Sequence, residues 1–168
     1  MPVSDQGVTT NRYSLIPRTL IFITRGESVL LLKGASNKRL WANRYNGVGG
    51  HVEQGEDVLS AAKRELQEET GLQANNLWLC GTVTIDTGQS IGVGLYVFKG
   101  DSQDDQLIHS KEGNLAWIPF HEVTAKPLVE DLEILLPKVL AMRKSSPPFS
   151  AHYSYDKDHN LVIKFGKA

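Results

Sequence analysis

The segment at residues 50–72 restricts the possible folds of this chain more than any other part of the sequence. Residues 56–70 are predicted to form a helix, because apolar side chains recur there at helical spacing. The expected buried stripe consists of Leu59, Ala62 and Leu66. Glu56 and Asp57 favour the positive N-terminal end of such a helix, and Gly71 follows its last turn as a C-cap.

Three glutamates crowd the second half of this predicted helix. Glu65, Glu68 and Glu69 are spaced i, i+3 and i+4, so their side chains share one helix face. Like charges at this spacing destabilise an isolated helix, but shared divalent cations would remove the repulsion. Carboxylate oxygens suit Mg²⁺ or Mn²⁺, and these ions commonly bind substrate phosphates as well. The alternative is a solvated acidic face without a ligand, which is the usual meaning of a charge run.

Composition excludes several classes of protein. The 168 residues suffice for one domain with a core, and the net charge of −1 gives no basic surface for duplex nucleic acid. The single cysteine, Cys80, excludes an internal disulfide framework and a cysteine-rich zinc site. The apolar run at residues 20–24 is too short to span a bilayer, and no secretory signal is evident. We therefore expect a cytoplasmic protein without a membrane partner.

The remainder of the chain predicts a sheet and a second helix, which together indicate an α+β domain. Strands are expected at residues 18–24, 29–33, 77–85, 91–100 and 115–120. Residues 34–46 are polar with interspersed aromatics and predict a long loop, a feature that is often functional in a compact domain. Residues 128–142 predict a helix, with Pro137 as a kink or break.

The complete pattern in residues 50–72 is far more specific than the glutamates alone. It fits G-x5-E-x7-R-E-U-x-E-E-x-G-U at every position, where U is aliphatic. This is the Nudix box, so the chain resembles the MutT/Nudix hydrolases. The resemblance implies an α/β/α sandwich with a mixed sheet between helices. It also implies hydrolysis of a nucleoside diphosphate linked to another group X, with Mg²⁺ as cofactor and Mn²⁺ as a possible substitute.

The resemblance also assigns roles within the box. Glu65, Glu68 and Glu69 would be metal ligands, together with the carbonyl of Gly49 or Gly50. Either Glu69 or a loop glutamate would orient or deprotonate the attacking water, and Glu68 stays a candidate for a catalytic role.

Two box residues and one loop glutamate receive other roles from the same resemblance. Glu56 and Arg64 would be mainly structural, forming a pair that fixes the loop and helix. Glu112 precedes Trp117 by five residues, a spacing similar to that in Nudix enzymes that hydrolyse oxidised purine nucleotides. Glu112 would then be a metal ligand or catalytic carboxylate, whereas an exposed turn glutamate is the alternative.

Substrate contacts are predicted outside the box. Asn46 precedes the glycine-rich stretch and would bind a purine edge, because an amide both donates and accepts; a turn asparagine is the alternative. An aromatic near the site, Trp41, Tyr45 or Trp117, would stack on a base, with core or loop packing as the alternative. His51 would touch a phosphate. Glu130 and Asp131 would read the base, and an exposed charge pair at a helix N-terminus is the alternative.

The division of the chain and its activity follow as expectations. Residues 1–12 would form a flexible arm, residues 13–143 the Nudix domain, and residues 144–168 a C-terminal hairpin or edge-strand extension of that domain. The leading prediction is hydrolysis of an oxidised purine nucleoside triphosphate to a monophosphate and pyrophosphate by a monomer or homodimer. Alternatives are ADP-ribose, a dinucleoside polyphosphate, an isoprenoid or sugar diphosphate, or a non-catalytic nucleotide-binding module.

Overall fold

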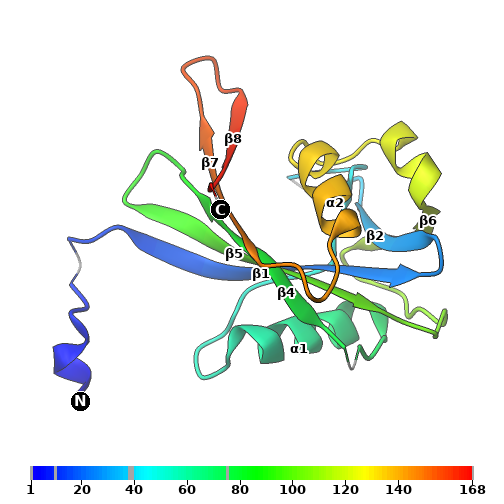
Figure 1. The fold of residues 1–168 in the computed structure, drawn as a ribbon, viewed down its shortest axis with the longest axis horizontal. Helices are drawn as coiled ribbons and strands as arrows, with labels where there is room; N and C mark the ends of the chain where they lie inside the picture. Colours follow the sequence, from blue (N-terminus) through cyan, green and yellow to red (C-terminus); the bar gives the residue numbers. More distant parts are fainter. Residues whose placement is uncertain (1, 10, 38–39, 75, 168) are drawn as a thin grey trace.

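The computed structural model describes residues 2–9, 11–37, 40–74 and 76–167, which form one mixed sheet between helices (Figure 1). Its strands are β1 (Ser14–Arg25), β2 (Ser28–Gly34), β3 (Tyr45–Asn46), β4 (Trp78–Ile85), β5 (Ile91–Asp101), β6 (Gly113–Pro119), β7 (Phe149–Tyr155) and β8 (Leu161–Phe165). Its helices are α1 (Val58–Thr70) and α2 (Leu132–Ala141), with short 3-10 helices η1 (Val3–Gln6) and η2 (Phe120–Ala125). The described residues contain no helix able to span a bilayer.

The sheet combines parallel and antiparallel pairs. Its strand order is β3-β2-β1-β5-β4-β7-β8, and β6 pairs with β2 outside this path. β1 runs parallel to β5, and β4 runs parallel to β7, whereas the other pairs are antiparallel. The predicted mixed sheet is therefore confirmed.

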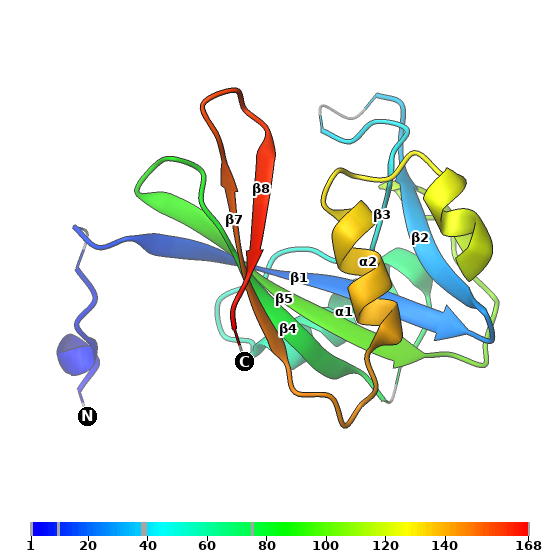
Figure 2. The same cartoon turned by 45° about the horizontal axis from the view of Figure 1, so that its top comes forward.

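β1 explains why helices cover both faces of the sheet. Its centre is apolar at every position, as expected for a strand that is buried on both sides. Leu20 and Phe22 belong to the hydrophobic cluster that contains α2 residues, whereas Ile21 and Ile23 belong to the cluster that contains α1 residues. These two clusters make the sheet the middle layer of an α/β/α sandwich (Figure 2).

The box helix is shorter than predicted at its N-terminus. α1 begins at Val58, because the Asp57 side chain accepts hydrogen bonds from the backbone N–H groups of Leu59 and Ser60 at 2.9 and 3.0 Å. Glu56 therefore lies outside the helix. The predicted C-cap is confirmed: Gly71 has a φ of 79° and donates to the Gln67 carbonyl at 2.9 Å.

The second helix also begins later than predicted. α2 begins at Leu132 rather than at residue 128, because the backbone just before it pairs with β3. Tyr45 N–H donates to the Pro127 carbonyl at 2.8 Å, and Val129 N–H donates to the Tyr45 carbonyl at 2.9 Å. Pro137 lies inside α2 and does not end it.

The ends of two predicted strands and of one predicted loop also differ from the structure. β1 begins four residues before the predicted strand, because its extra residues pair with β5 from Ser14↔Ile91 onward. β6 spans residues 113–119, and the chain then enters η2. The predicted loop at residues 34–46 ends in β3, which pairs with β2.

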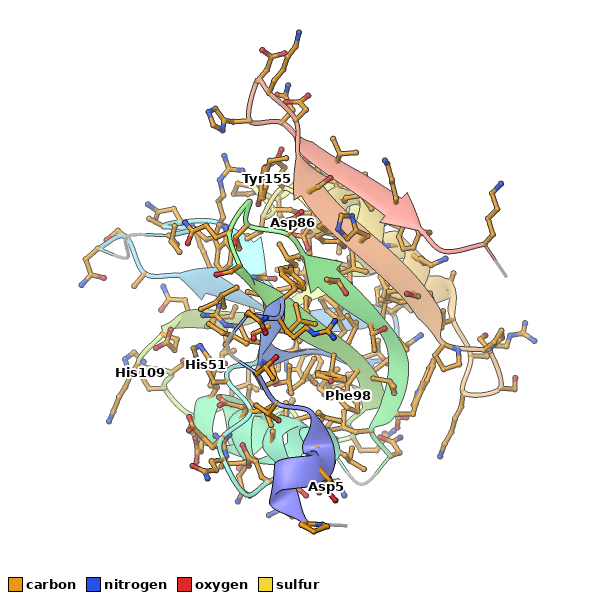
Figure 3. The ribbon with its side chains drawn as sticks, turned by 90° about the vertical axis from the view of Figure 1, so that its left-hand side faces the viewer. Asp5, His51, Asp86, Phe98, His109 and Tyr155 are labelled. Carbon is orange, nitrogen blue, oxygen red and sulfur yellow. The ribbon has the colours of Figure 1, made fainter. Side chains whose placement is uncertain are left out.

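The C-terminal strands extend the sheet. β7 pairs with β4 over residues 149–153, and β8 pairs with β7 in an antiparallel hairpin. Asp86, in the turn that joins β4 to β5, donates its N–H to the Tyr153 carbonyl at 2.8 Å. Tyr155 lies near Asp86 at this end of the sheet in Figure 3. The hairpin therefore brings C-terminal side chains toward the same sheet face as α2.

Candidate active site

Arg64 connects the box helix to the loop before it. Its Nε donates to Glu56 Oε2 at 3.1 Å, and its Nη2 donates to Glu56 Oε1 at 2.6 Å. The same Nη2 donates to the His51 carbonyl at 3.1 Å. Glu56 Oε1 also accepts the Glu53 N–H at 2.7 Å, which closes the loop. The Arg64 hydrogen bond, followed by that of Glu53, lowers the pKa of Glu56, so this carboxylate stays ionised beside the guanidinium.

The same guanidinium contacts two of the crowded glutamates. Arg64 Nη1 donates to Glu65 Oε1 at 2.8 Å and to Glu68 Oε2 at 3.3 Å. The Glu65 side chain is 14% exposed, whereas that of Glu68 is 60% exposed. Hydrogen bonds to Glu56 and Glu65 raise the pKa of Arg64 above its already high usual value. Arg64 therefore offsets part of the repulsion among the box carboxylates.

Two glycines allow the backbone to approach the box helix closely. A Cβ on Gly50 would lie 2.5 Å from the Glu65 carboxylate oxygens, so a larger residue would displace that side chain. Gly49 has a φ of 152°, and a Cβ there would lie 2.1 Å from the Thr19 carbonyl. Thr19 N–H donates to the Gly50 carbonyl at 2.9 Å, which anchors this backbone on β1. Glycine at both positions thus lets this backbone pack closely against β1 and against the Glu65 carboxylate.

A cavity of about 920 Å³ opens beside these glycines. The predicted metal-site residues that line it are Gly49, Gly50, Glu65, Glu69 and Glu112. The predicted substrate-binding residues that line it are Asn46, His51, Glu130 and Asp131. Residues from distant parts of the sequence therefore line one cavity.

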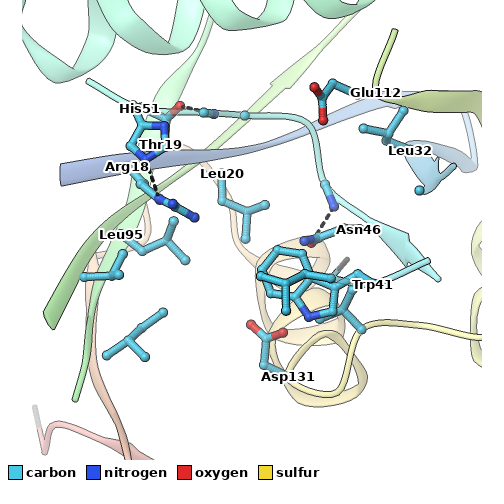
Figure 4. Close-up of a pocket in the computed structure, with 18 of the residues that line it drawn as sticks. Arg18, Thr19, Leu20, Leu32, Trp41, Asn46, His51, Leu95, Glu112 and Asp131 are labelled. Carbon is cyan, nitrogen blue, oxygen red and sulfur yellow. Dashed lines mark hydrogen bonds between the residues drawn. The ribbon is translucent and has the colours of Figure 1, made fainter. Parts of the chain in front are cut away.

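Glu112 faces the cavity from the segment before β6 (Figure 4). Its N–H donates to the Ser110 hydroxyl at 3.1 Å, and its carbonyl accepts the Ala35 N–H at 3.2 Å. These two bonds fix its backbone beside β2. The structure thus places Glu112 in the same cavity as the box carboxylates.

Glu68 and Trp117 do not line the cavity. Glu68 points outward on α1 and contacts Arg64. Trp117 pairs with Leu30 across β2 and β6, and it packs against the cluster on the α1 face of the sheet. Strand alternation explains this placement, because each residue in a strand faces the side opposite to its neighbours. The structure therefore gives no support to a base contact by Trp117.

The oxygen groups that line the cavity are of the kind that binds a divalent metal ion. Carboxylate and main-chain oxygens are the ligands that Mg²⁺ and Mn²⁺ prefer. Within the described ranges, however, no three side chains of His, Cys, Asp or Glu are gathered closely enough to hold a metal ion as they stand. Arg64 Nη1 holds Glu65 Oε1, and the Glu68 side chain points outward, so Glu68 would have to turn toward the cavity to reach a metal ion.

Asn46 lies at the opposite side of the cavity from His51 in Figure 4. Its Oδ1 accepts the Gly47 N–H at 2.8 Å, as in a turn, which leaves the amide NH₂ to donate to a ligand. Arg44 Nη1 donates to the Leu128 carbonyl at 2.9 Å and ties the segment before α2 to this strand. The tie places Asn46 and Asp131 on the walls of one cavity.

Asp131 is the more enclosed member of the predicted acidic pair. Burial raises the pKa of Asp131, and the neighbouring charge of Glu130 raises it further, whereas the Glu130 side chain itself is exposed. Asp131 therefore keeps its proton to a higher pH than an ordinary aspartic acid, and the protonated carboxyl can donate a hydrogen bond.

The cavity also contains Trp41, one of the aromatics considered for base stacking, and two residues that the sequence did not single out, Arg18 and Tyr153. Arg18 lies on β1, just before the apolar centre of that strand. Its Nε donates to His51 Nε2 at 3.1 Å. Trp41 comes from the loop before β3, and Tyr153 comes from the C-terminal hairpin. The aromatic content of the loop was a usable signal for Trp41. Tyr153 was hidden, since its place depends on the pairing of β7 with β4.

The Tyr153 hydroxyl is a buried polar group beside the cavity. Tyr153 is 2% exposed, and among the described residues its Oη has no hydrogen-bond partner. Burial, followed by the charge of Asp131, raises the pKa of Tyr153 and keeps the hydroxyl protonated. A buried polar group without a partner costs about 1–3 kcal/mol.

We expect Tyr153→Phe to raise the free energy of unfolding by about 1 kcal/mol in urea titrations. A lower free energy of unfolding would contradict this, and Tyr155→Phe at the exposed end of β7 is the control.

Comparison with known proteins places this geometry in a family. A family model described as the NUDIX domain matches residues 15–139. This chain belongs to the Nudix family. The family assignment from the box is confirmed, and the chain is a Nudix pyrophosphohydrolase. Enzymes of this family generally use divalent metal ions, in keeping with the oxygen donors around Gly50.

Individual relatives point to nucleotide substrates. The oxidized purine nucleoside triphosphate hydrolase of Mus musculus is 27% identical over 148 residues, which cover 88% of this chain and 90% of that protein. The crystal structure of the mutator MutT protein from Bacillus halodurans has a TM-score of 0.75 and 26% identity, and it covers 90% of this chain and 97% of that chain. The NAD-capped RNA hydrolase NudC of Pseudomonas aeruginosa is 33% identical over 82 residues, which are 49% of this chain and 28% of that protein.

Proposed function

We propose that this Nudix hydrolase converts an oxidised purine nucleoside triphosphate, in the presence of Mg²⁺ or Mn²⁺, to the monophosphate and pyrophosphate. The observation that carries the proposal is the single cavity in which the box residues Glu65 and Glu69 meet Asn46 and Asp131. Such a cavity offers carboxylates for a metal–phosphate complex at one side and hydrogen-bonding groups for a base at the other. The mouse relative is named for the same substrate class, and the match covers 90% of its length, which supports the assignment.

At the phosphate side, the chain supplies carboxylates, main-chain oxygen and cationic groups. Glu65, Glu69 and Glu112 would hold the metal, joined by Glu68 when it leaves Arg64. The Gly49 carbonyl would be the main-chain ligand, because the Gly50 carbonyl already accepts the Thr19 N–H. A bound divalent metal would neutralise phosphate charge and lower the pKa of an attacking water.

Other side chains that face the cavity would orient the attacking water and contact the phosphate chain. Glu69 or Glu112 would orient this water and accept its proton, which requires a carboxylate within hydrogen-bond reach. Arg18 and His51, which are hydrogen-bonded to each other, would contact the phosphate chain. A guanidinium is well suited to phosphate oxygens because its donors form a fixed fork.

At the base side, Asn46 and Asp131 would read the purine edge. The Asn46 amide nitrogen can donate, because Oδ1 is already used by the Gly47 N–H. Asp131, whose pKa is raised mainly by burial, would donate from its protonated carboxyl to a purine O6 or N7. Glu130 is exposed beside it and would act at the rim.

Other diphosphates remain the competing substrates. The ADP-ribose subgroup usually carries a proline well downstream of the box, but Asp86 and Thr87 occupy the corresponding positions here. The partial match to an NAD-capped RNA hydrolase spans only 82 residues. Both facts favour a nucleoside triphosphate over these alternatives.

The test is a substrate panel with Mg²⁺ and Mn²⁺. We expect kcat/KM for 8-oxo-dGTP to exceed that for ADP-ribose and for diadenosine polyphosphates by at least about tenfold, because the polar groups of the base side match one substrate class. The phosphate product should be pyrophosphate, detected separately from orthophosphate. Preference for ADP-ribose, or release of orthophosphate alone from 8-oxo-dGTP, would refute the proposed substrate.

A further inference from the structure

Trp41 is an exposed tryptophan in an unusual backbone conformation inside the proposed nucleotide cavity. It lies in the loop between β2 and β3 and lines the cavity with Asn46 and Asp131. In the view of Figure 4, its indole is drawn between those two side chains. Trp41 thus presents an aromatic surface in the same part of the cavity as the two groups proposed to read a purine edge.

The backbone of Trp41 is held in the left-handed region. Its φ is 57°, a value that bulky residues rarely adopt. The Trp41 carbonyl accepts the Arg44 N–H at 3.0 Å, and the Gly34 carbonyl accepts the Asn43 N–H at 2.9 Å. A Cβ on Gly34 would lie 2.6 Å from the Trp41 carbonyl oxygen, so only glycine permits this approach. The loop therefore fixes the position of Trp41 at the expense of an unfavourable conformation.

The environment of the indole does not explain this conformation either. Trp41 is 48% exposed. Trp78 and Trp117 each pack against one of the two hydrophobic clusters, and Trp41 is part of neither cluster. An exposed tryptophan with a strained backbone contributes little to folding stability. Residues of this kind persist where a site needs them in place.

We propose that Trp41 is the stacking platform for the base of the bound nucleotide. A flat indole gives a base a large contact surface, and stacking of this kind is strong without depending on the identity of the base. Asn46 and Asp131 would then discriminate among bases, whereas Trp41 would supply affinity for any of them. The inference rests on the proposed function for the orientation of the nucleotide. It restricts the substrates of this enzyme to molecules that contain an aromatic base.

Intrinsic fluorescence measures this contact without turnover. In EDTA, titration of the wild-type protein with 8-oxo-dGTP is expected to quench tryptophan emission, because the base stacks on Trp41. Trp41→Gly should lose this quenching and bind the nucleotide at least about tenfold more weakly, as measured by calorimetry. Trp41→Phe should keep most of the affinity, since phenylalanine retains an aromatic face.

Two controls separate stacking from a structural role. Glycine adopts a φ of 57° without strain, so Trp41→Gly is expected to keep or raise the Tm. Affinity for tripolyphosphate, which has no base, should stay within twofold of wild type. Trp78→Phe, on β4, should retain the nucleotide-dependent quenching. Unchanged nucleotide affinity in Trp41→Gly, or an equal loss of tripolyphosphate binding, would overturn the proposal.

The outcome can be told apart from a failure of the proposed substrate. If the wild-type enzyme prefers ADP-ribose to 8-oxo-dGTP, the proposed function fails, but Trp41-dependent quenching by ADP-ribose would support the stacking role. If 8-oxo-dGTP is hydrolysed with the same KM by wild type and Trp41→Gly, the function stands and the stacking role is refuted.

Discussion

Glu69→Gln is expected to reduce kcat by at least about 100-fold while the protein remains folded, since a positioned general base contributes about 100- to 10,000-fold. Glu69 lines the same cavity as Gly50, where it would bind the metal and orient the attacking water. Glutamine keeps the size and the helix propensity of glutamate but removes the charge. Circular dichroism would establish the fold, and steady-state assays with Mg²⁺ would give kcat.

Glu68→Gln should give a loss of the same kind, although Glu68 points away from the cavity in the structure. The expectation depends on Glu68 leaving Arg64 when a divalent ion binds. Glu133→Gln is the matched control, because it neutralises an exposed helix glutamate outside the cavity. Wild-type rates for either box variant would remove that residue from the metal site.

The box is the part of the site that sequence spacing could predict. Helical periodicity puts Glu65 and Glu69 on one face, and Arg64 lies one turn before Glu68. These relations are local, so they survive in the structure. The pairing of Arg64 with Glu56 spans eight positions and rests on a capped helix start, which Asp57 provides.

The base side depends on long-range pairing that spacing does not encode. Trp117 faces α1 because β6 pairs with β2 in one register, and a shift by one residue would have turned it to the other face. Tyr153 reaches the cavity through the parallel pairing of β7 with β4. Trp41 owes its position to a close approach to Gly34. None of these contacts has a periodic pattern in the sequence.

Arg64→Lys is expected to weaken metal binding by about 10–100-fold, the usual effect of removing a group that orients metal ligands. Arg64 bridges Glu56, the His51 carbonyl and two box glutamates through three different nitrogen atoms. An ammonium group is a single point of charge and cannot reproduce this fork. Lysine therefore retains the charge but releases the loop that carries Gly49 and Gly50.

Two measurements would test this role of Arg64. Calorimetric titration with Mn²⁺ should show the lower affinity directly. A metal that binds only the folded protein raises the Tm, so the increase caused by Mn²⁺ should be smaller in Arg64→Lys than in wild type. Lys63→Arg, at the exposed neighbouring position of α1, controls for exchange of one cation for another. If Arg64→Lys binds Mn²⁺ as wild type does, charge alone suffices at this position. If its affinity falls while Lys63→Arg is unchanged, the geometry of the guanidinium is what holds Glu65 and the glycine loop in place for the metal.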